Sequence, residues 1–146
     1  MPKEENCIFC KIVAGDIACH KLYEDEATMA FMDINPANPG HALVIPKSHS
    51  PDVATIPFPA LSRVAATAKR IAQAILAALA PDGLNLVQAN GHGAAQSIAH
   101  FHIHVLPRRH DDGLKLNWGL APGDPDEIAQ WAERIRAELS KSDGKE

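Results

Sequence analysis

The chain has 146 residues, 46% of them hydrophobic, which supports one folded domain and argues against a disordered chain. Lysine and arginine together number 14, and aspartate and glutamate 18, so the formal charge is −4, which argues against an extensive surface for nucleic acid. The N-terminus lacks the apolar core of a signal peptide, and no apolar stretch is long enough to cross a bilayer. We therefore expect a cytoplasmic protein with neither a membrane nor a nucleic acid as partner.

The order of apolar and turn residues predicts short strands mixed with helices. Residues 21–33 hold two short apolar runs around an acidic turn at residues 24–26, which favours a hairpin. Two prolines and a glycine predict a rigid loop at residues 35–40, and a strand follows at residues 41–45. Over residues 59–80 apolar side chains recur every three or four positions, which is the spacing of an amphipathic helix.

Two more strands and a second helix are predicted after residue 80. The strands cover residues 84–88 and 100–106. A helix begins near Asp124, which can cap it, and the stripe expected to be buried is Ile128, Trp131, Ile135 and Leu139. Because regular βαβ alternation is absent, we predict one α+β domain over residues 1–140 with a mainly antiparallel sheet, one long central helix and a C-terminal helix. Residues 141–146 are expected to form a frayed tail.

Two of the three cysteines form a CxxC motif, Cys7 to Cys10, near the start of the chain. This motif alone leaves three interpretations open: half of a metal site, a redox pair, or two buried thiols. A redox pair normally opens a helix after a strand, and no strand is predicted before Cys7, which disfavours that interpretation. A zinc site would need two further ligands, which the histidine-rich regions can supply. Cys19 has no partner nearby and is assigned a structural role.

Three of the eight histidines alternate with apolar residues over positions 100–105. In a strand, alternate side chains share one face, whereas in a helix residues two apart diverge by about 200°. We therefore predict a strand in which the histidines share one face and the apolar side chains enter the core, namely Phe101, Ile103 and Val105.

The histidine run has three interpretations. It could be a half-exposed strand that carries histidine by chance, although strict triple alternation disfavours this. It could be a catalytic metal site with three ligands, but strand residues two apart lie about 6.6 Å apart and the outer pair about 13 Å. The third interpretation gives one imidazole the role of nucleophile at phosphorus and another that of charge stabiliser, and the geometry favours it. The small residues at 91–97 would then bring backbone close to a phosphate, and no Walker A, Rossmann or Asp-rich magnesium motif is present.

The segment from His100 to Leu106, HFHIHVL, resembles the signature of the histidine triad (HIT) family. The resemblance extends to CIFCKI at the N-terminus, to FMDINPANPGHALVIPKSH over residues 31–49, and to the Gln96-Ser97 pair. Leu116-Asn117-Trp118 also resembles bacterial members, though less specifically. On these motifs the chain is identified as a member of the family, similar to its Hint-like or general bacterial branch, with residues 1–140 as a single HIT domain.

The resemblance implies a role for each candidate site residue. His102 corresponds to the nucleophile that takes the nucleotidyl group, and the other catalytic residues are His104 and His41, which flank the phosphate, and Ser97, near the leaving group. Asp33 corresponds to the carboxylate that accepts both ribose hydroxyls. The remaining substrate-binding residues are Phe9, Phe31, Ile34 and Leu43, which wall the base pocket, and Asn90 and Gln96, which add polar contacts.

The resemblance also implies a structural zinc ion and a homodimer. The implied ligands form a closed Cys₂His₂ set, which is typical of structural rather than catalytic zinc, and they are Cys7, Cys10, His49 and His100. No metal is expected to take part in the chemistry. In the dimer the two sheets would join into one continuous sheet.

The implied activity is hydrolysis of purine nucleoside phosphoramidates or related nucleotide conjugates through a nucleotidyl-His102 intermediate. A dinucleoside polyphosphate hydrolase of the Fhit-like branch shares the nucleophile and differs in leaving group. The same residues could also serve a nucleotide-binding module with little turnover, and a catalytic zinc hydrolase is the least favoured interpretation. Two departures from the family pattern, Ala89 in place of Asn and Ala95 in place of Gly, bear on rate and substrate choice.

Overall fold

The structure is a computed structural model that describes residues 4–115 and 118–142. Leu116 and Asn117 of the predicted Leu-Asn-Trp motif lie outside the described residues, as do residues 143–146 of the predicted tail. Residue contacts group the chain into two compact units, Met1–Gly113 and Leu114–Glu146. The prediction of one domain over residues 1–140 therefore stays a prediction.

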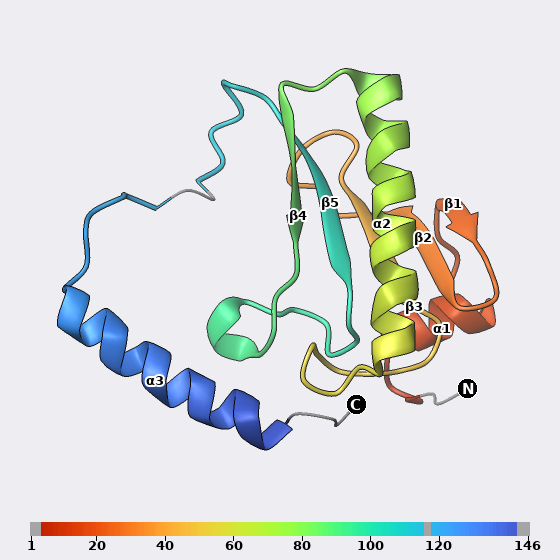
Figure 1. Cartoon of the computed structure of the whole chain (residues 1–146). Coiled ribbons are helices and arrows are strands. Elements are labelled where there is room, and N and C mark those ends of the chain that lie inside the picture. The colour runs from red at the N-terminus through yellow and green to blue at the C-terminus, as the bar shows by residue number, and fades with distance from the viewer. Residues whose placement is uncertain (1–3, 116–117, 143–146) are drawn as a thin grey trace. The chain divides into compact units, whose positions relative to one another are not determined.

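The first unit is an antiparallel sheet with a long helix along one face (Figure 1). Among the described residues the strands follow the order β1-β2-β3-β5-β4, and each pairing is antiparallel. Their bounds are β1 (Lys21–Glu24), β2 (Thr28–Met32), β3 (Ala42–Pro46), β4 (Gly83–Val87) and β5 (Ile103–Arg108). The prediction of an α+β fold with a mainly antiparallel sheet is confirmed.

Two helices lie on opposite faces of this sheet. The central helix α2 (Phe58–Leu79) starts one residue before its predicted position and packs a buried stripe on the sheet, formed by Val64, Thr67, Ala68, Ile71 and Ile75. The short helix α1 (Ile8–Ala14) was not predicted. It begins after Cys7, whose Sγ accepts a hydrogen bond from the Cys10 N–H at 3.4 Å, so the first cysteine of the CxxC motif caps the helix.

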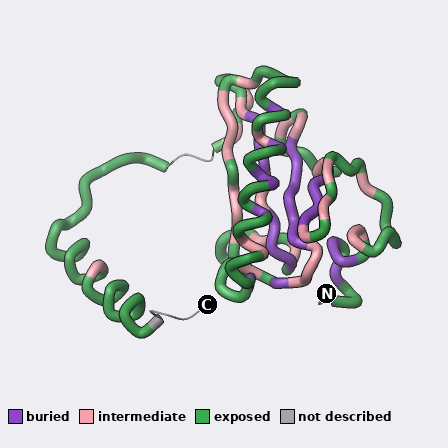
Figure 2. The backbone as a smooth tube through the Cα atoms, turned by 45° about the vertical axis from the view of Figure 1, so that its right-hand side comes forward, coloured by how far each residue is buried: buried purple, intermediate pink, exposed green. Residues whose placement is uncertain are grey.

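Strand β3 is buried on both faces, which explains its uninterrupted apolar sequence. Ala42 and Val44 pack in the core beneath α2, whereas Leu43 and Ile45 pack in a second core with residues of α1. Figure 2 shows the buried residues concentrated in the middle strands and on one side of α2. The second core, on the α1 face, forms the base of the functional site.

The predicted alternation of the histidine run is confirmed, but the strand begins later than expected. Phe101 and Val105 are buried in the core beneath α2, on the opposite face from the histidines. Strand β5 starts at Ile103 rather than at His100. The reason lies in Pro46, which has no N–H for the ladder and whose carbonyl oxygen instead accepts a hydrogen bond from the His100 ring at 2.8 Å.

The second unit contains α3 (Pro125–Ser142), which begins where the sequence predicts. Asp124 precedes it, and its carboxylate accepts a hydrogen bond from the Asp126 N–H at 2.8 Å. The second unit by itself does not bury the apolar stripe predicted for this helix, which is 54–60% exposed at Ile128, Trp131, Ile135 and Leu139. Helical periodicity predicts an apolar face but not what covers it. Within the described parts of the chain, no helix is long and apolar enough to cross a membrane.

Candidate functional site

A cavity of about 520 Å³ opens on the α1 face of the sheet. It brings together nine of the eleven residues predicted to bind substrate or to act in catalysis. These are His102, His104, His41, Ser97, Asp33, Phe9, Phe31, Ile34 and Leu43. Phe9, Phe31 and Leu43 are buried and form its floor, whereas Ile34 is 79% exposed and lies at its rim.

Strand register explains why residues distant in sequence share this cavity. Phe31 of β2 lies opposite Leu43 of β3, and Leu43 lies opposite His104 of β5. Directly paired residues point to the same face of a sheet, so these three side chains form a row across the cavity floor. His102, two residues before His104, faces the same side and contacts Phe9 edge to face at a ring distance of 5.2 Å.

The proline-rich loop after β2 fixes the ring of His41. The Ala37 N–H donates to His41 Nδ1 at 3.0 Å, so in the neutral ring the proton sits on Nε2. Nε2 in turn lies 2.9 Å from His104 Nδ1 and 3.5 Å from a carboxylate oxygen of Asp33. His41 therefore donates to His104 Nδ1, and His104 is left with a protonated Nε2 that can donate to a ligand.

Burial keeps these two imidazoles uncharged at neutral pH. It lowers the pKa of His41, against the opposing effect of the Asp33 carboxylate. It also lowers the pKa of His104 to about 4, and the neighbouring rings of His102 and His41 add to the shift. The Asp33, His41 and His104 donor atoms lie within 4.8 Å of one another, which a metal could exploit. Because His41 Nε2 carries a proton, it offers no lone pair to a metal ion, and the three side chains form a hydrogen-bonded array.

His102 has the tautomer that a nucleophile needs. Its Nδ1 lies 2.7 Å from the carbonyl oxygen of His100, which can only accept, so Nδ1 carries the proton. Nε2 is left with its lone pair in a ring that is only 3% exposed. Burial lowers the pKa of His102, so the lone pair is available at neutral pH. The arrangement can therefore attack an electrophile such as a phosphorus atom bound beside His104.

Two predicted substrate-binding residues do not line the cavity. Gln96 accepts from the Gly91 N–H at 2.8 Å and donates to the carbonyl oxygens of Pro51 and Ile98 at 2.7 and 3.0 Å. Asn90 accepts from the Val53 N–H at 2.7 Å. Both side chains fix the shape of the loop before β5, and their contact with substrate stays a prediction.

The same loop holds Ala95 in a backbone conformation that favours glycine, with φ +62° and ψ +34°. We expect Ala95→Gly to raise the free energy of unfolding by about 0.5 to 1 kcal/mol, because relief of the left-handed strain exceeds the added chain entropy. Ala94→Gly is the matched control, since Ala94 has a negative φ and should only lose stability. Urea denaturation measures both, and equal losses in the two variants would contradict the strain at Ala95.

Sequence reasoning missed several cavity residues in and after α1. These are Ile8, Ile12, Ile17, Ala18 and Cys19, with Met32, Asn35 and Ile98 from other segments. The sequence pattern that could have predicted them is the spacing of Ile8 and Ile12, which lie four residues apart on one face of a short helix. Cys19, assigned only a structural role, borders the cavity and packs against the second core.

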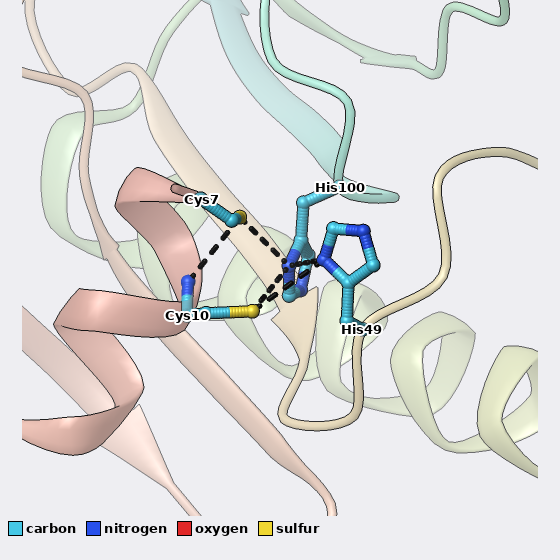
Figure 3. A group of neighbouring side chains, drawn as sticks. All are labelled: Cys7, Cys10, His49 and His100. Atoms are coloured by element: carbon cyan, nitrogen blue, oxygen red, sulfur yellow. Dashed lines mark hydrogen bonds between the residues drawn. The ribbon is translucent and has the colours of Figure 1, made fainter. Parts of the chain in front are cut away.

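The four predicted zinc ligands converge beside this cavity (Figure 3). The two cysteines come from the start of α1, His49 from the loop after β3, and His100 from the segment before β5. His100 Nδ1 lies 3.4 Å from Cys7 Sγ, 3.6 Å from Cys10 Sγ and 3.2 Å from His49 Nδ1. Cys10 Sγ lies 3.4 Å from His49 Nδ1.

These distances suit a tetrahedral metal ion. Zinc bond lengths of about 2.0–2.3 Å place ligand atoms about 3.3–3.8 Å apart at tetrahedral angles. The His100 Nε2–H donates to the Pro46 carbonyl oxygen at 2.8 Å, so its Nδ1 presents a lone pair to the cluster. Burial lowers the pKa of His100 to about 4, which keeps the ring neutral, and raises the pKa of the Cys10 thiol. A dication would offset that rise by stabilising the thiolate.

The fold and the site together define a small α+β protein with a histidine-lined pocket on one face of its sheet. Residues 14–111 match the HIT domain, and the chain belongs to the HIT family. It is 38% identical over 135 residues to the adenosine 5'-monophosphoramidase hnt1 of Schizosaccharomyces pombe, covering 92% of this chain and 98% of that protein.

Two solved structures share the fold. A HIT family protein of Bacillus subtilis is 39% identical with a TM-score of 0.86, over 91% of this chain and 96% of that one. A zinc-bound histidine triad protein of Mycobacterium smegmatis is 37% identical with a TM-score of 0.70, over 94% of this chain and 98% of that one. The prediction of a HIT-like fold is thereby confirmed.

Proposed function

We propose that the chain is a Hint-like nucleotide hydrolase that cleaves purine nucleoside 5'-phosphoramidates or related nucleotide conjugates. The observation that carries this proposal is the tautomer of His102, whose Nε2 lone pair faces a pocket that also holds His104 and Asp33. The similarity to an adenosine 5'-monophosphoramidase supports the same class of substrate. The reaction proceeds in two displacements at the α-phosphorus.

In the first displacement His102 Nε2 forms a bond to phosphorus while the bond from phosphorus to the leaving amine breaks. The amine takes up a proton from solvent as it departs past the Ser97 hydroxyl, at the edge of the cavity. The His104 Nε2–H, oriented by the hydrogen bond from His41, donates to a phosphate oxygen as charge develops. In the second displacement water attacks phosphorus and releases a proton to solvent, His102 leaves as a neutral ring, and a nucleoside monophosphate is released.

The pocket walls suit a purine nucleoside. Phe9, Phe31 and Leu43 provide apolar and aromatic surface for the base. One carboxylate oxygen of Asp33 accepts from the Asn35 N–H at 2.8 Å, which orients the group, and the carboxylate accepts the ribose hydroxyls. Ile34 closes the outer wall at the rim.

We further propose that Cys7, Cys10, His49 and His100 bind one structural zinc ion. The fit of their spacing to a tetrahedron supports this, as does the zinc-bound relative from Mycobacterium smegmatis. The ion would join the N-terminal helix to the segment that carries the nucleophile, and no step of the chemistry passes through it. The protein is further proposed to be a cytoplasmic homodimer. Strand β4 lies at one edge of the described sheet, where its backbone groups can pair with a strand of a second copy.

The direct test is hydrolysis of an adenosine 5'-phosphoramidate, followed by the release of both AMP and the amine. We expect turnover of the phosphoramidate and much slower turnover of diadenosine tetraphosphate under the same conditions. Faster cleavage of the tetraphosphate would favour the polyphosphate hydrolase. AMP binding by calorimetry without turnover of either substrate would favour a nucleotide-binding module.

A further inference from the structure

We propose that a second cavity beside the nucleotide pocket receives the leaving group, and that Glu4 at this cavity selects neutral or cationic leaving groups over anionic ones. This inference rests on the proposed function, because it concerns what departs from the phosphorus that His102 attacks.

The second cavity adjoins the first across three shared residues. It has a volume of about 440 Å³, and Ile8, Ser97 and Ile98 line both cavities. In the proposed reaction the nucleoside lies in the first cavity between Phe9 and Asp33, and the leaving group lies on the side of Ser97, which the two cavities share. In a displacement at phosphorus the attacking and leaving atoms lie on opposite sides. A group that departs past Ser97 therefore enters the second cavity.

The charges of the two cavities disfavour an anion. Among the described residues, neither cavity is lined by a lysine or an arginine. Asp33 lines the first cavity and Glu4 lines the second, so each cavity has an acidic residue in its lining. Cys7 and His49 also line the second cavity, but a zinc ion with two thiolates carries no net charge. A polyphosphate leaving group would therefore meet only negative side-chain charge, whereas an ammonium group would be attracted.

The backbone at Glu4 is held at the edge of this cavity. Its N–H donates to Cys10 Sγ at 3.4 Å, and its carbonyl oxygen accepts from the Cys7 N–H at 3.0 Å. Both bonds tie residue 4 to the start of α1, next to the cysteine cluster. Apolar surface from Ile8, Pro51 and Ile98 lines the same cavity and suits an aliphatic chain. The matching ligand is an alkyl amine with an uncharged or cationic end.

The experiment uses adenosine 5'-phosphoramidates of three alkyl amines of equal length that end in a methyl, an ammonium or a carboxylate group. The zinc-loaded protein should show the highest kcat/KM with the ammonium end and the lowest with the carboxylate, about ten-fold apart at low ionic strength. Glu4→Gln should reduce this ratio and Glu4→Lys should reverse it. Glu5→Lys is the matched control, because Glu5 is exposed and does not line the cavity, and it should retain at least half of the wild-type ratio.

A binding measurement separates this inference from the proposed activity. The Kd of each compound for the His102→Ala variant should follow the same order, and Glu4→Lys in that background should reverse it. If the protein cleaves none of the compounds but binds them in this order, the leaving-group site stands and the proposed hydrolysis is wrong. If the protein cleaves all three at equal rates, or if Glu4→Lys and Glu5→Lys shift the ratio equally, the inference is overturned.

Discussion

Replacing His102 with alanine is expected to lower kcat/KM for an adenosine 5'-phosphoramidate by about 10⁴-fold or more, the size of effect that follows loss of a nucleophile. No neighbouring imidazole can take its place. His104 Nδ1 accepts the hydrogen bond from His41, and its Nε2 is protonated. The lone pair of His100 points into the cysteine cluster, away from the pocket.

The measurement is a steady-state assay of AMP release, with His20→Ala as the matched control. His20 is exposed and does not line the cavity, so its replacement should leave the rate unchanged. Quenching during turnover with an alkaline denaturant, which preserves the acid-labile bond from phosphorus to histidine, should also yield wild-type chains heavier by one adenylyl group, and none in the His102→Ala variant. A folded His102→Ala variant that keeps a tenth of the activity would refute the nucleotidyl-histidine mechanism.

Removal of the proposed zinc ion is expected to lower Tm by roughly 10–15 °C. The four ligands cross-link three segments that are distant in sequence. In a chain of this size, loss of such a cross-link lowers the free energy of unfolding by about 3–5 kcal/mol. Excess chelator should produce this shift in a thermal melt followed by circular dichroism. Cys10→Ser should cause a similar loss, and chelator should then have little further effect, because both changes remove the same interaction.

The Cys19→Ser variant is the matched control, because it distinguishes the loss of a metal ligand from the loss of any thiol. Cys19 is half-buried and packs against the second core, but it is not one of the four ligands. We expect Cys19→Ser to keep the full sensitivity to chelator. Purified chain that contains no zinc, and whose Tm does not change on addition of zinc, would contradict the structural role of the cluster.

Periodicity predicted most of the first unit because its elements bury a regular face. The stripe of α2 and the alternation of Phe101, Ile103 and Val105 are local patterns that depend only on which side of the element meets the core. The start of β5 could not be predicted in this way. It depends on Pro46, which lies 54 positions from its hydrogen-bond partner His100 along the chain.

The residues proposed to act in catalysis could be predicted from sequence, whereas the structural role of the loop residues could not. The histidine run and the proline-rich loop form uninterrupted motifs, and the structure brings their side chains into one pocket. Asn90 and Gln96 were predicted from the same kind of motif, but an amide side chain can bind a ligand or its own loop equally well. Only the positions of Gly91 and Pro51 show that Gln96 holds the loop.

His100 serves two parts of the molecule through different atoms. Its ring faces the cysteine cluster, while its backbone carbonyl oxygen fixes the proton on His102. Every amino acid has that carbonyl, so a substitution can remove the ring, and with it the proposed metal site, without changing the tautomer of His102. Selection on stability and selection on chemistry can therefore act separately at this position, and a relative that has lost its cysteines need not have lost its reaction.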